Sequence, residues 1–113
     1  MEKRRVIFSP EAAVDLSDLY EYIAKQSGLT RAINYIGRIE QYCAGFKFSP
    51  ERGTKRDDLR PGLRIAGFER RITIAFHVQL DAVVIDRILY AGRDVKRAFR
   101  TVALPGRRVV RKF

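Results

Sequence analysis

The spacing of apolar residues changes partway along this chain of 113 residues, and that change restricts the folds it can adopt. Over residues 12–23 and 32–46, apolar side chains recur every three or four positions, the repeat of a helix with one buried face. Over residues 72–78 they recur at every second position, the repeat of a half-buried strand. Two helices followed by strands predict an α+β fold.

The ends of the two helices are marked by residues that favour helix boundaries. Ser9 can accept hydrogen bonds from free N–H groups, and Pro10 fits the first turn because it has no N–H to leave unpaired. Gly28 can adopt the left-handed conformation that ends a helix, and Thr30 is predicted to cap the next one. So short a connection predicts an antiparallel helical hairpin. A brief strand at residues 6–8 is predicted to precede it.

Strand signals dominate the second half, after a stretch rich in Pro, Gly and charge that predicts a loop over residues 49–62. Residues 63–66 can form a strand, Gly67 a turn, and Leu80 with Asp81 a second turn. Residues 82–90 are apolar almost throughout, which favours a central strand. We therefore expect the hairpin to cover one face of a mainly antiparallel sheet of about four strands, with the other face uncovered.

The charge is strongly positive and unevenly placed. The chain carries a net charge of +10 at pH 7, and the stretch from Arg93 to the end contains eight basic residues and one acidic residue. An acidic partner is predicted, such as nucleic acid, an acidic protein or an anionic membrane. We expect a single domain over residues 1–100 and a basic tail over residues 101–113, where Pro105 and Gly106 interrupt regular structure.

Several classes of protein are disfavoured by the sequence. Cys43 is the only cysteine and His77 the only histidine, so no disulfide, zinc site or other metal site is expected. We find no phosphate-binding glycine loop and predict no cofactor. No run of apolar residues approaches the ~20 needed to cross a membrane, and no signal peptide is recognisable. The chain is expected to be cytoplasmic.

Four segments resemble the ParE branch of the RelE/ParE toxins, in the order typical of that family. They are SPEAAVDL at residues 9–16, SPERG at 49–53, DLRPGLR at 58–64 and VIDRILYAGRD at 84–94. Any one of these motifs is weakly specific, whereas together they cover about residues 4–97.

The resemblance implies the toxin component of a type II toxin–antitoxin system, a class linked to plasmid stabilisation. Such a toxin binds a cognate antitoxin, forming a hetero-oligomer, and inhibits DNA gyrase without a catalytic residue of its own. Guanidinium groups suit the carboxylates of an acidic partner or the phosphates of DNA. The residues expected to bind the target or partner are Arg60, Arg64, Arg87, Arg93, Asp94 and Arg97.

Two alternatives remain open at the level of sequence. The related RelE branch cleaves messenger RNA on the ribosome, and an endoribonuclease of that kind would here rely on His77, Arg87 and Tyr90. A simpler interpretation of His77 is a half-exposed strand residue. The second alternative is a basic DNA-binding module, supported only by the charge and the tail.

Overall fold

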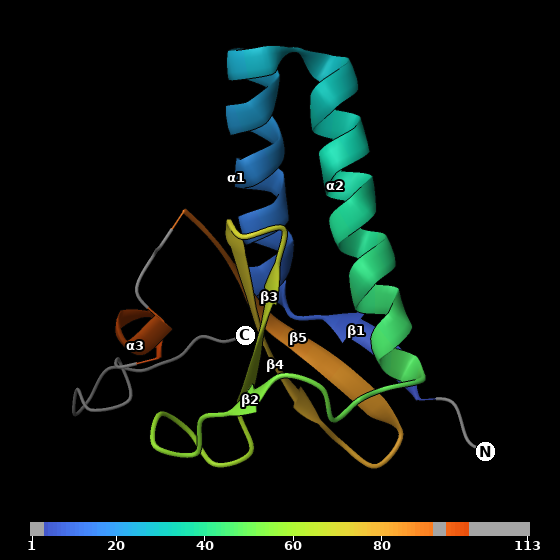
Figure 1. Ribbon diagram of the computed structural model, residues 1–113, viewed down its shortest axis with the longest axis vertical. Helices are drawn as coiled ribbons and strands as arrows, with labels where there is room; N and C mark the ends of the chain where they lie inside the picture. Colours follow the sequence, from blue (N-terminus) through green and yellow to red (C-terminus); the bar gives the residue numbers. More distant parts are fainter. Residues whose placement is uncertain (1–3, 92–94, 100–113) are drawn as a thin grey trace.

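A computed structural model describes residues 4–91 and 95–99 of the chain (Figure 1). Two long helices stand on one side of a five-stranded sheet with the order β1-β5-β4-β3-β2. The α+β expectation is confirmed, with one short strand more than predicted. In chain order, the elements are β1 (Arg5–Phe8), α1 (Pro10–Ser27), α2 (Leu29–Ala44), η1 (Gly45–Lys47), β2 (Thr54–Lys55), β3 (Arg64–Phe68), β4 (Ile72–Val78), β5 (Ala82–Tyr90) and α3 (Val95–Ala98).

The start of α1 is fixed by Ser9, as the sequence predicts. Its hydroxyl oxygen accepts a hydrogen bond from the backbone N–H of Ala12 at 3.0 Å and donates one to the carbonyl oxygen of Asp86 at 2.9 Å. Its backbone N–H also donates to the carbonyl oxygen of Ile85 at 2.9 Å. One serine therefore caps the helix and ties it to β5.

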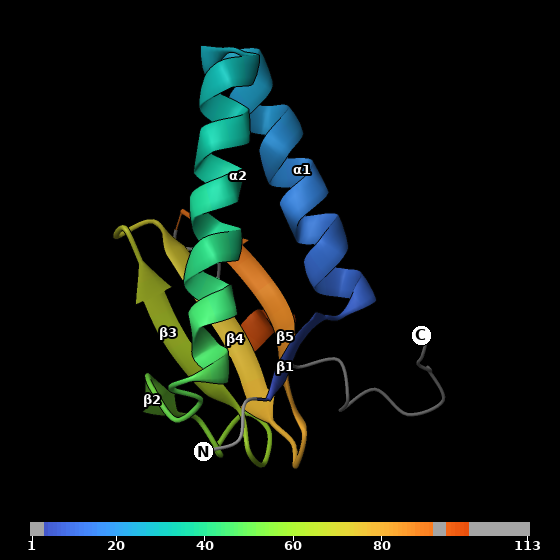
Figure 2. The same ribbon diagram turned by 90° about the vertical axis from the view of Figure 1, so that its right-hand side faces the viewer.

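The hairpin connection is tighter than predicted. Gly28 ends α1 with φ of 97° and is followed at once by Leu29, the first residue of α2, so the predicted capping role of Thr30 is wrong. The positive φ is the reason a glycine stands here, since other residues rarely adopt it. Figures 1 and 2 show the hairpin running up past the end of the sheet.

The sheet is antiparallel except for one pair. β1 lies parallel to β5, while the pairs β5–β4, β4–β3 and β3–β2 are antiparallel. The predicted interior position of residues 82–90 is confirmed, because β5 has a partner strand on each side. The predicted loop at residues 49–62 contains β2, which pairs over only two residues.

The predicted turn at Gly67 is wrong. Gly67 pairs with Thr73 inside β3, and the chain reverses over residues 69–71, where Glu69 and Arg70 have φ of 49° and 67°. Two residues with side chains thus adopt a conformation usually left to glycine or asparagine. The hydrogen bonds that Arg38 of α2 donates to the Glu69 carboxylate help to hold this turn in place.

β5 contains a bulge at Asp86. Ala75 lies opposite Arg87 and Phe76 opposite Ile85, so Asp86 is an extra residue with no partner position on β4. A bulge of this kind resets which side chains share a face. It lets Val83, Ile85, Ile88 and Tyr90 all pack towards the hairpin, although their numbers are not all odd or all even.

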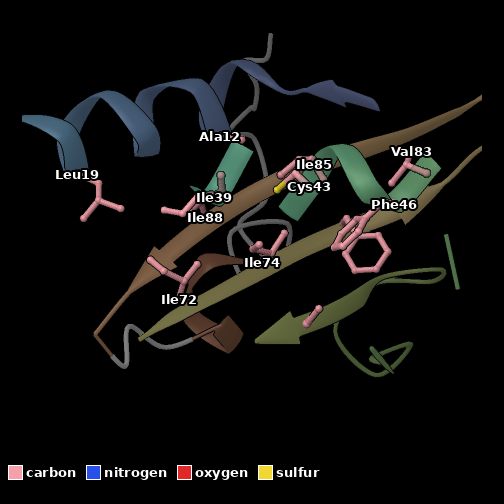
Figure 3. Packing of buried hydrophobic residues seen from close by; sticks show 12 residues of the cluster. Ala12, Leu19, Ile39, Cys43, Phe46, Ile72, Ile74, Val83, Ile85 and Ile88 are labelled. Atoms are coloured by element: carbon pink, nitrogen blue, oxygen red, sulfur yellow. The ribbon is translucent and has the colours of Figure 1, made fainter. Parts of the chain in front are cut away.

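The main core lies between the hairpin and the sheet. Its centre includes Ile39 and Cys43 of α2 and Phe46 of η1, which are fully buried against β4 and β5 (Figure 3). The rings of Phe46 and Phe76 lie 4.5 Å apart between centroids. Burial raises the pKa of the Cys43 thiol to about 12, as expected for an inert core cysteine.

The opposite face of the sheet was expected to be uncovered, and this is wrong. A second cluster of Leu63, Ala75 and Phe99 is buried there, with Leu59 and Val95 packed against it. Ala75 alternates along β4 with Ile74 and Phe76 of the main core, so the two clusters lie on opposite faces. In Figure 1, α3 and the hairpin accordingly lie on opposite sides of the sheet. We call these the rear face and the hairpin face.

No helix within residues 4–91 and 95–99 is long and apolar enough to cross a membrane. The tail predicted over residues 101–113 lies outside the described residues, as do Arg93 and Asp94.

Candidate functional site

The predicted binding residues fall into different structural settings, and Arg87 is the most constrained of them. Its Nε and Nη2 atoms donate to the two carboxylate oxygens of Asp15 on α1, at 2.8 and 2.9 Å. The Asp15 side chain is 6% exposed and that of Arg87 is 22% exposed. This hydrogen bonding raises the pKa of the Arg87 guanidinium above its usual value. Arg87 therefore joins α1 to β5.

Asp15 also completes the backbone hydrogen bonding of the sheet. β1 pairs with β5 only as far as Ile85, so beyond that point the edge of β5 has no neighbouring strand among the described residues. There the backbone N–H of Ile88 donates to Asp15 Oδ2 at 2.8 Å. Although Asp15 belongs to α1, its carboxylate therefore acts across the fold, on β5.

Arg64 is a second arginine with a structural role. Its Nε donates to the carbonyl oxygen of Arg52 at 3.0 Å, and its Nη2 to that of Glu51 at 2.6 Å. The segment it holds also passes close to β3, since a Cβ placed on Gly53 would collide with the carbonyl oxygen of Ile65. Arg64 and Gly53 together fix the connection before β3. The glycine of the SPERG segment is needed for this close approach, and the carbonyl groups just before it accept the hydrogen bonds of Arg64.

The rear face carries three polar side chains and one aromatic ring that we call the rear cluster: Arg60, His77, Asp86 and Phe99. His77 Nδ1 lies 2.7 Å from Asp86 Oδ2, and Arg60 Nη1 lies 3.7 Å from Asp86 Oδ1. The Arg60 guanidinium stands 4.7 Å from the centroid of the Phe99 ring. The side chain of Arg60 is 44% exposed.

Asp86 is buried more deeply than its partners and is incompletely neutralised. Burial raises the pKa of its carboxyl group, and the hydrogen bond from His77 opposes that effect. With Nδ1 of His77 as donor to Asp86, Nε2 is left to accept from the amide of Gln79, 3.2 Å away. In the rear cluster, the Asp86 carboxyl group therefore contacts both an imidazole and a half-exposed guanidinium.

The three residues of the ribonuclease alternative are not brought together. His77 pairs with Val84 near one end of β5, whereas Tyr90 pairs with Ile72 at the other, which separates them by about 17 Å along the strands. Tyr90 also packs on the hairpin face, 5.9 Å from the ring of Tyr22, while His77 lies on the rear face. Arg87 is bound to Asp15.

The remaining predicted residue, Arg97, is exposed on α3, close in sequence to Phe99 of the rear cluster. Arg60 and Arg97 are therefore both accessible to solvent. Sequence reasoning missed Asp15, Gln79 and Phe99. The one usable signal was Phe99, an aromatic residue just beyond the family-like segments and next to basic residues.

Over the described ranges, the structure has no group of three or more His, Cys, Asp or Glu residues placed to hold a metal ion.

Both the sequence and the fold of this chain are similar to those of known proteins. A family model described as the ParE toxin of the type II toxin–antitoxin system parDE matches residues 6–95. A solved structure described as a chromosomal ParDE toxin–antitoxin system from P. aeruginosa is similar in fold, with a TM-score of 0.69 and 22% identity. That match covers 79% of this chain and 97% of the other. No curated protein matches the sequence.

Proposed function

The chain belongs to the ParE toxin family of type II toxin–antitoxin systems, and on that basis we propose that it is a toxin that inhibits DNA gyrase and is neutralised by a cognate antitoxin. The observation that carries this proposal is the family match over residues 6–95, which takes in every strand of the sheet except the first residue of β1, as well as both long helices. Inhibition requires binding rather than catalysis, which suits a chain whose candidate acid–base residues are spread over two faces of the sheet.

We assign contact with the target to the rear face, through Arg60 and Arg97. Both are basic and solvent-accessible, and the contacts of the Arg60 guanidinium with Asp86 at 3.7 Å and with the Phe99 ring are longer than hydrogen bonds. Arg64 and Arg87 are poorer candidates, since their donors are already used within the fold. Exposed guanidinium groups bind phosphate or carboxylate in a planar, bidentate manner, which suits gyrase-bound DNA or an acidic surface.

The antitoxin is proposed to form a hetero-oligomer with the toxin. The chain's charge of +10 favours an acidic antitoxin segment. Exposed apolar side chains offer such a segment hydrophobic contacts, and among the described residues Leu29, Ile33 and Phe48 are each more than half exposed.

A RelE-like, ribosome-dependent endoribonuclease is the second candidate, and the pairing of His77 with Asp86 is the observation in its favour. A carboxylate that orients an imidazole can support general base catalysis. The placement of Tyr90 on the other face counts against it, because no described tyrosine is left near His77 to act as the acid.

The test is gyrase supercoiling of relaxed plasmid in the presence of the purified, folded toxin. We expect loss of supercoiling together with trapped cleaved DNA, and restoration of activity when the antitoxin is added. A parallel reaction contains ribosomes translating a defined messenger RNA. Normal supercoiling with cleavage of the messenger RNA would replace the gyrase proposal with the endoribonuclease.

A further inference from the structure

A pocket of about 580 Å³ lies on the hairpin face, lined by residues of both long helices, of the β3–β4 turn and of the end of β5. Ligand pockets are usually between about 300 and 1,000 Å³. Seven of the lining residues come from the hairpin and three from the sheet end and the β3–β4 turn. They are Tyr22, Ile23, Gln26, Ser27, Arg31, Tyr35, Arg38, Glu69, Arg71 and Tyr90.

The pocket carries an excess of positive charge. Three of its residues are arginines, and Glu69 is its only acid. Arg38 neutralises Glu69 through two hydrogen bonds, from Nε at 2.8 Å and Nη2 at 2.9 Å. Within residues 4–91 and 95–99, the side chains of Arg31 and Arg71 form no hydrogen bond or ion pair. Two guanidinium groups are thus left to bind an anion of about two negative charges.

Three tyrosine rings also line the pocket. Tyr22 and Tyr90 lie 5.9 Å apart between ring centroids, and Arg38 stands 5.1 Å from the centroid of Tyr35. Tyr22 is 51% exposed although it is a large aromatic residue. An exposed ring beside free guanidinium groups is the arrangement with which proteins stack a nucleobase and bind its phosphate.

Three simpler ligands, namely a carboxylate, inorganic phosphate and phosphoserine, would each interact with only some of the side chains that line this pocket. A single carboxylate would leave one of the two arginines without a counter-charge. A phosphate monoester carries about −1.5 to −2 charges at pH 7 and matches both. Inorganic phosphate or a phosphorylated serine would leave the exposed part of the Tyr22 ring uncovered.

We propose that this pocket binds a nucleoside monophosphate group, with the phosphate between Arg31 and Arg71 and the base stacked on Tyr22. The group can belong to a free mononucleotide or to the phosphorylated end of a single nucleic-acid strand. This site lies on the opposite face of the sheet from the rear cluster and goes beyond the proposed inhibition of gyrase. Its test requires neither gyrase nor the antitoxin.

The experiment is calorimetric titration of the folded chain at about 0.15 M salt, where weak nonspecific attraction to the basic surface is reduced. The ligands are adenosine monophosphate, adenosine, inorganic phosphate and phosphoserine. We expect adenosine monophosphate to bind at least tenfold more tightly than the other three. No measurable binding at millimolar concentration, or equal affinity for phosphoserine, would overturn the proposal.

Two neighbouring arginines provide a matched control. Arg71 lines the pocket, while Arg70 in the same turn carries the same charge outside it. We expect Arg71→Gln to weaken adenosine monophosphate binding at least tenfold and Arg70→Gln to change it less than twofold. An equal loss in both variants would mean general charge attraction and would contradict a built site.

The stacking step and the source of the ligand are tested separately. Tyr22→Ala removes an exposed ring, so it should leave the fold intact while reducing affinity for adenosine monophosphate to that for inorganic phosphate. Unchanged affinity would refute stacking on Tyr22. A short single-stranded oligonucleotide with a 5′-phosphate is then compared with its 5′-hydroxyl form. Tighter binding of the phosphorylated strand than of the mononucleotide identifies a strand end as the ligand, and the reverse identifies a free nucleotide.

Discussion

One aspartate is buried on each side of the sheet, and the two carboxylates differ in the hydrogen-bond donors that surround them. On the hairpin side, Asp15 accepts three hydrogen bonds, two from Arg87 and one from the backbone N–H of Ile88. On the rear side, Asp86 has His77 at 2.7 Å, while Arg60 stays 3.7 Å away. Burial raises the pKa of Asp86 in spite of these partners. One carboxylate has a full set of donors and the other does not.

This difference separates arginines that hold the fold from arginines available to a partner. A buried charge with a full set of donors can be removed only at a large cost to stability. Arg60 instead remains half exposed and is held by a longer ion pair and an aromatic contact. This contrast is the basis on which we propose that the basic side chains of the rear face contact the target.

Asp15→Asn is expected to cause the largest loss of stability. Asparagine keeps one acceptor oxygen but leaves Arg87 partly buried without a counter-charge, which should lower the free energy of unfolding by about 3 kcal/mol. Urea unfolding followed by circular dichroism measures the effect. Asp18→Asn on the exposed surface of the same helix is the control and should change stability by less than about 0.5 kcal/mol. Equal effects in the two variants would disprove the structural role of Asp15.

A comparison of Arg64→Gln with Arg60→Gln sharpens the distinction between the two kinds of arginine. Loss of the two hydrogen bonds from Arg64 to backbone carbonyl groups should cost about 2 kcal/mol of stability. The Arg60 side chain is itself 44% exposed and its ion pair with the buried Asp86 is 3.7 Å long, so its replacement should cost less than about 1 kcal/mol. The same unfolding measurement serves for both. A larger loss from Arg60→Gln would reverse the assignment of roles.

Asp86→Asn should give a smaller effect that depends on pH. Because burial raises the pKa of Asp86, the folded state holds a proton there more tightly than the unfolded chain does. The stability linked to that proton is fully present below about pH 4, near the value for the unfolded chain, and is lost as the pH rises through the raised value. The stability of the variant relative to the native chain should therefore rise with pH, by roughly 1.4 kcal/mol per unit of pKa shift.

Unfolding measured in steps between pH 3 and pH 7 tests this sign. The stability of the variant relative to the native chain could instead stay constant over this range or fall with pH. Either result would show that the Asp86 carboxylate is as well neutralised as that of Asp15.

Local patterns were enough to predict much of the fold. Ser9, Pro10 and Gly28 act through their own backbone or the next turn, so their roles are readable from sequence. The alternation in β4 and the apolar run of β5 likewise correspond to observed strands. What could not be predicted depends on contacts between distant residues.

The roles of Asp15 and Asp86 illustrate that limit. Asp15 acts on residues more than seventy positions away, and nothing in its local sequence distinguishes it from Asp18. The bulge at Asp86 leaves a trace, since two charged residues interrupt an otherwise apolar strand, but the trace does not say where each side chain points. The pairs that decide which arginines are free could therefore be found only in three dimensions.

The most direct test of the account is gyrase inhibition by two folded double variants. Arg60→Gln with Arg97→Gln removes two charges from the rear face, and Lys25→Gln with Arg70→Gln removes two exposed charges from α1 and the β3–β4 turn. We predict that the first variant needs at least ten times more protein to inhibit supercoiling than the native chain, and the second less than twice as much. Equal potency of the two variants would contradict the claim that the rear face binds the target.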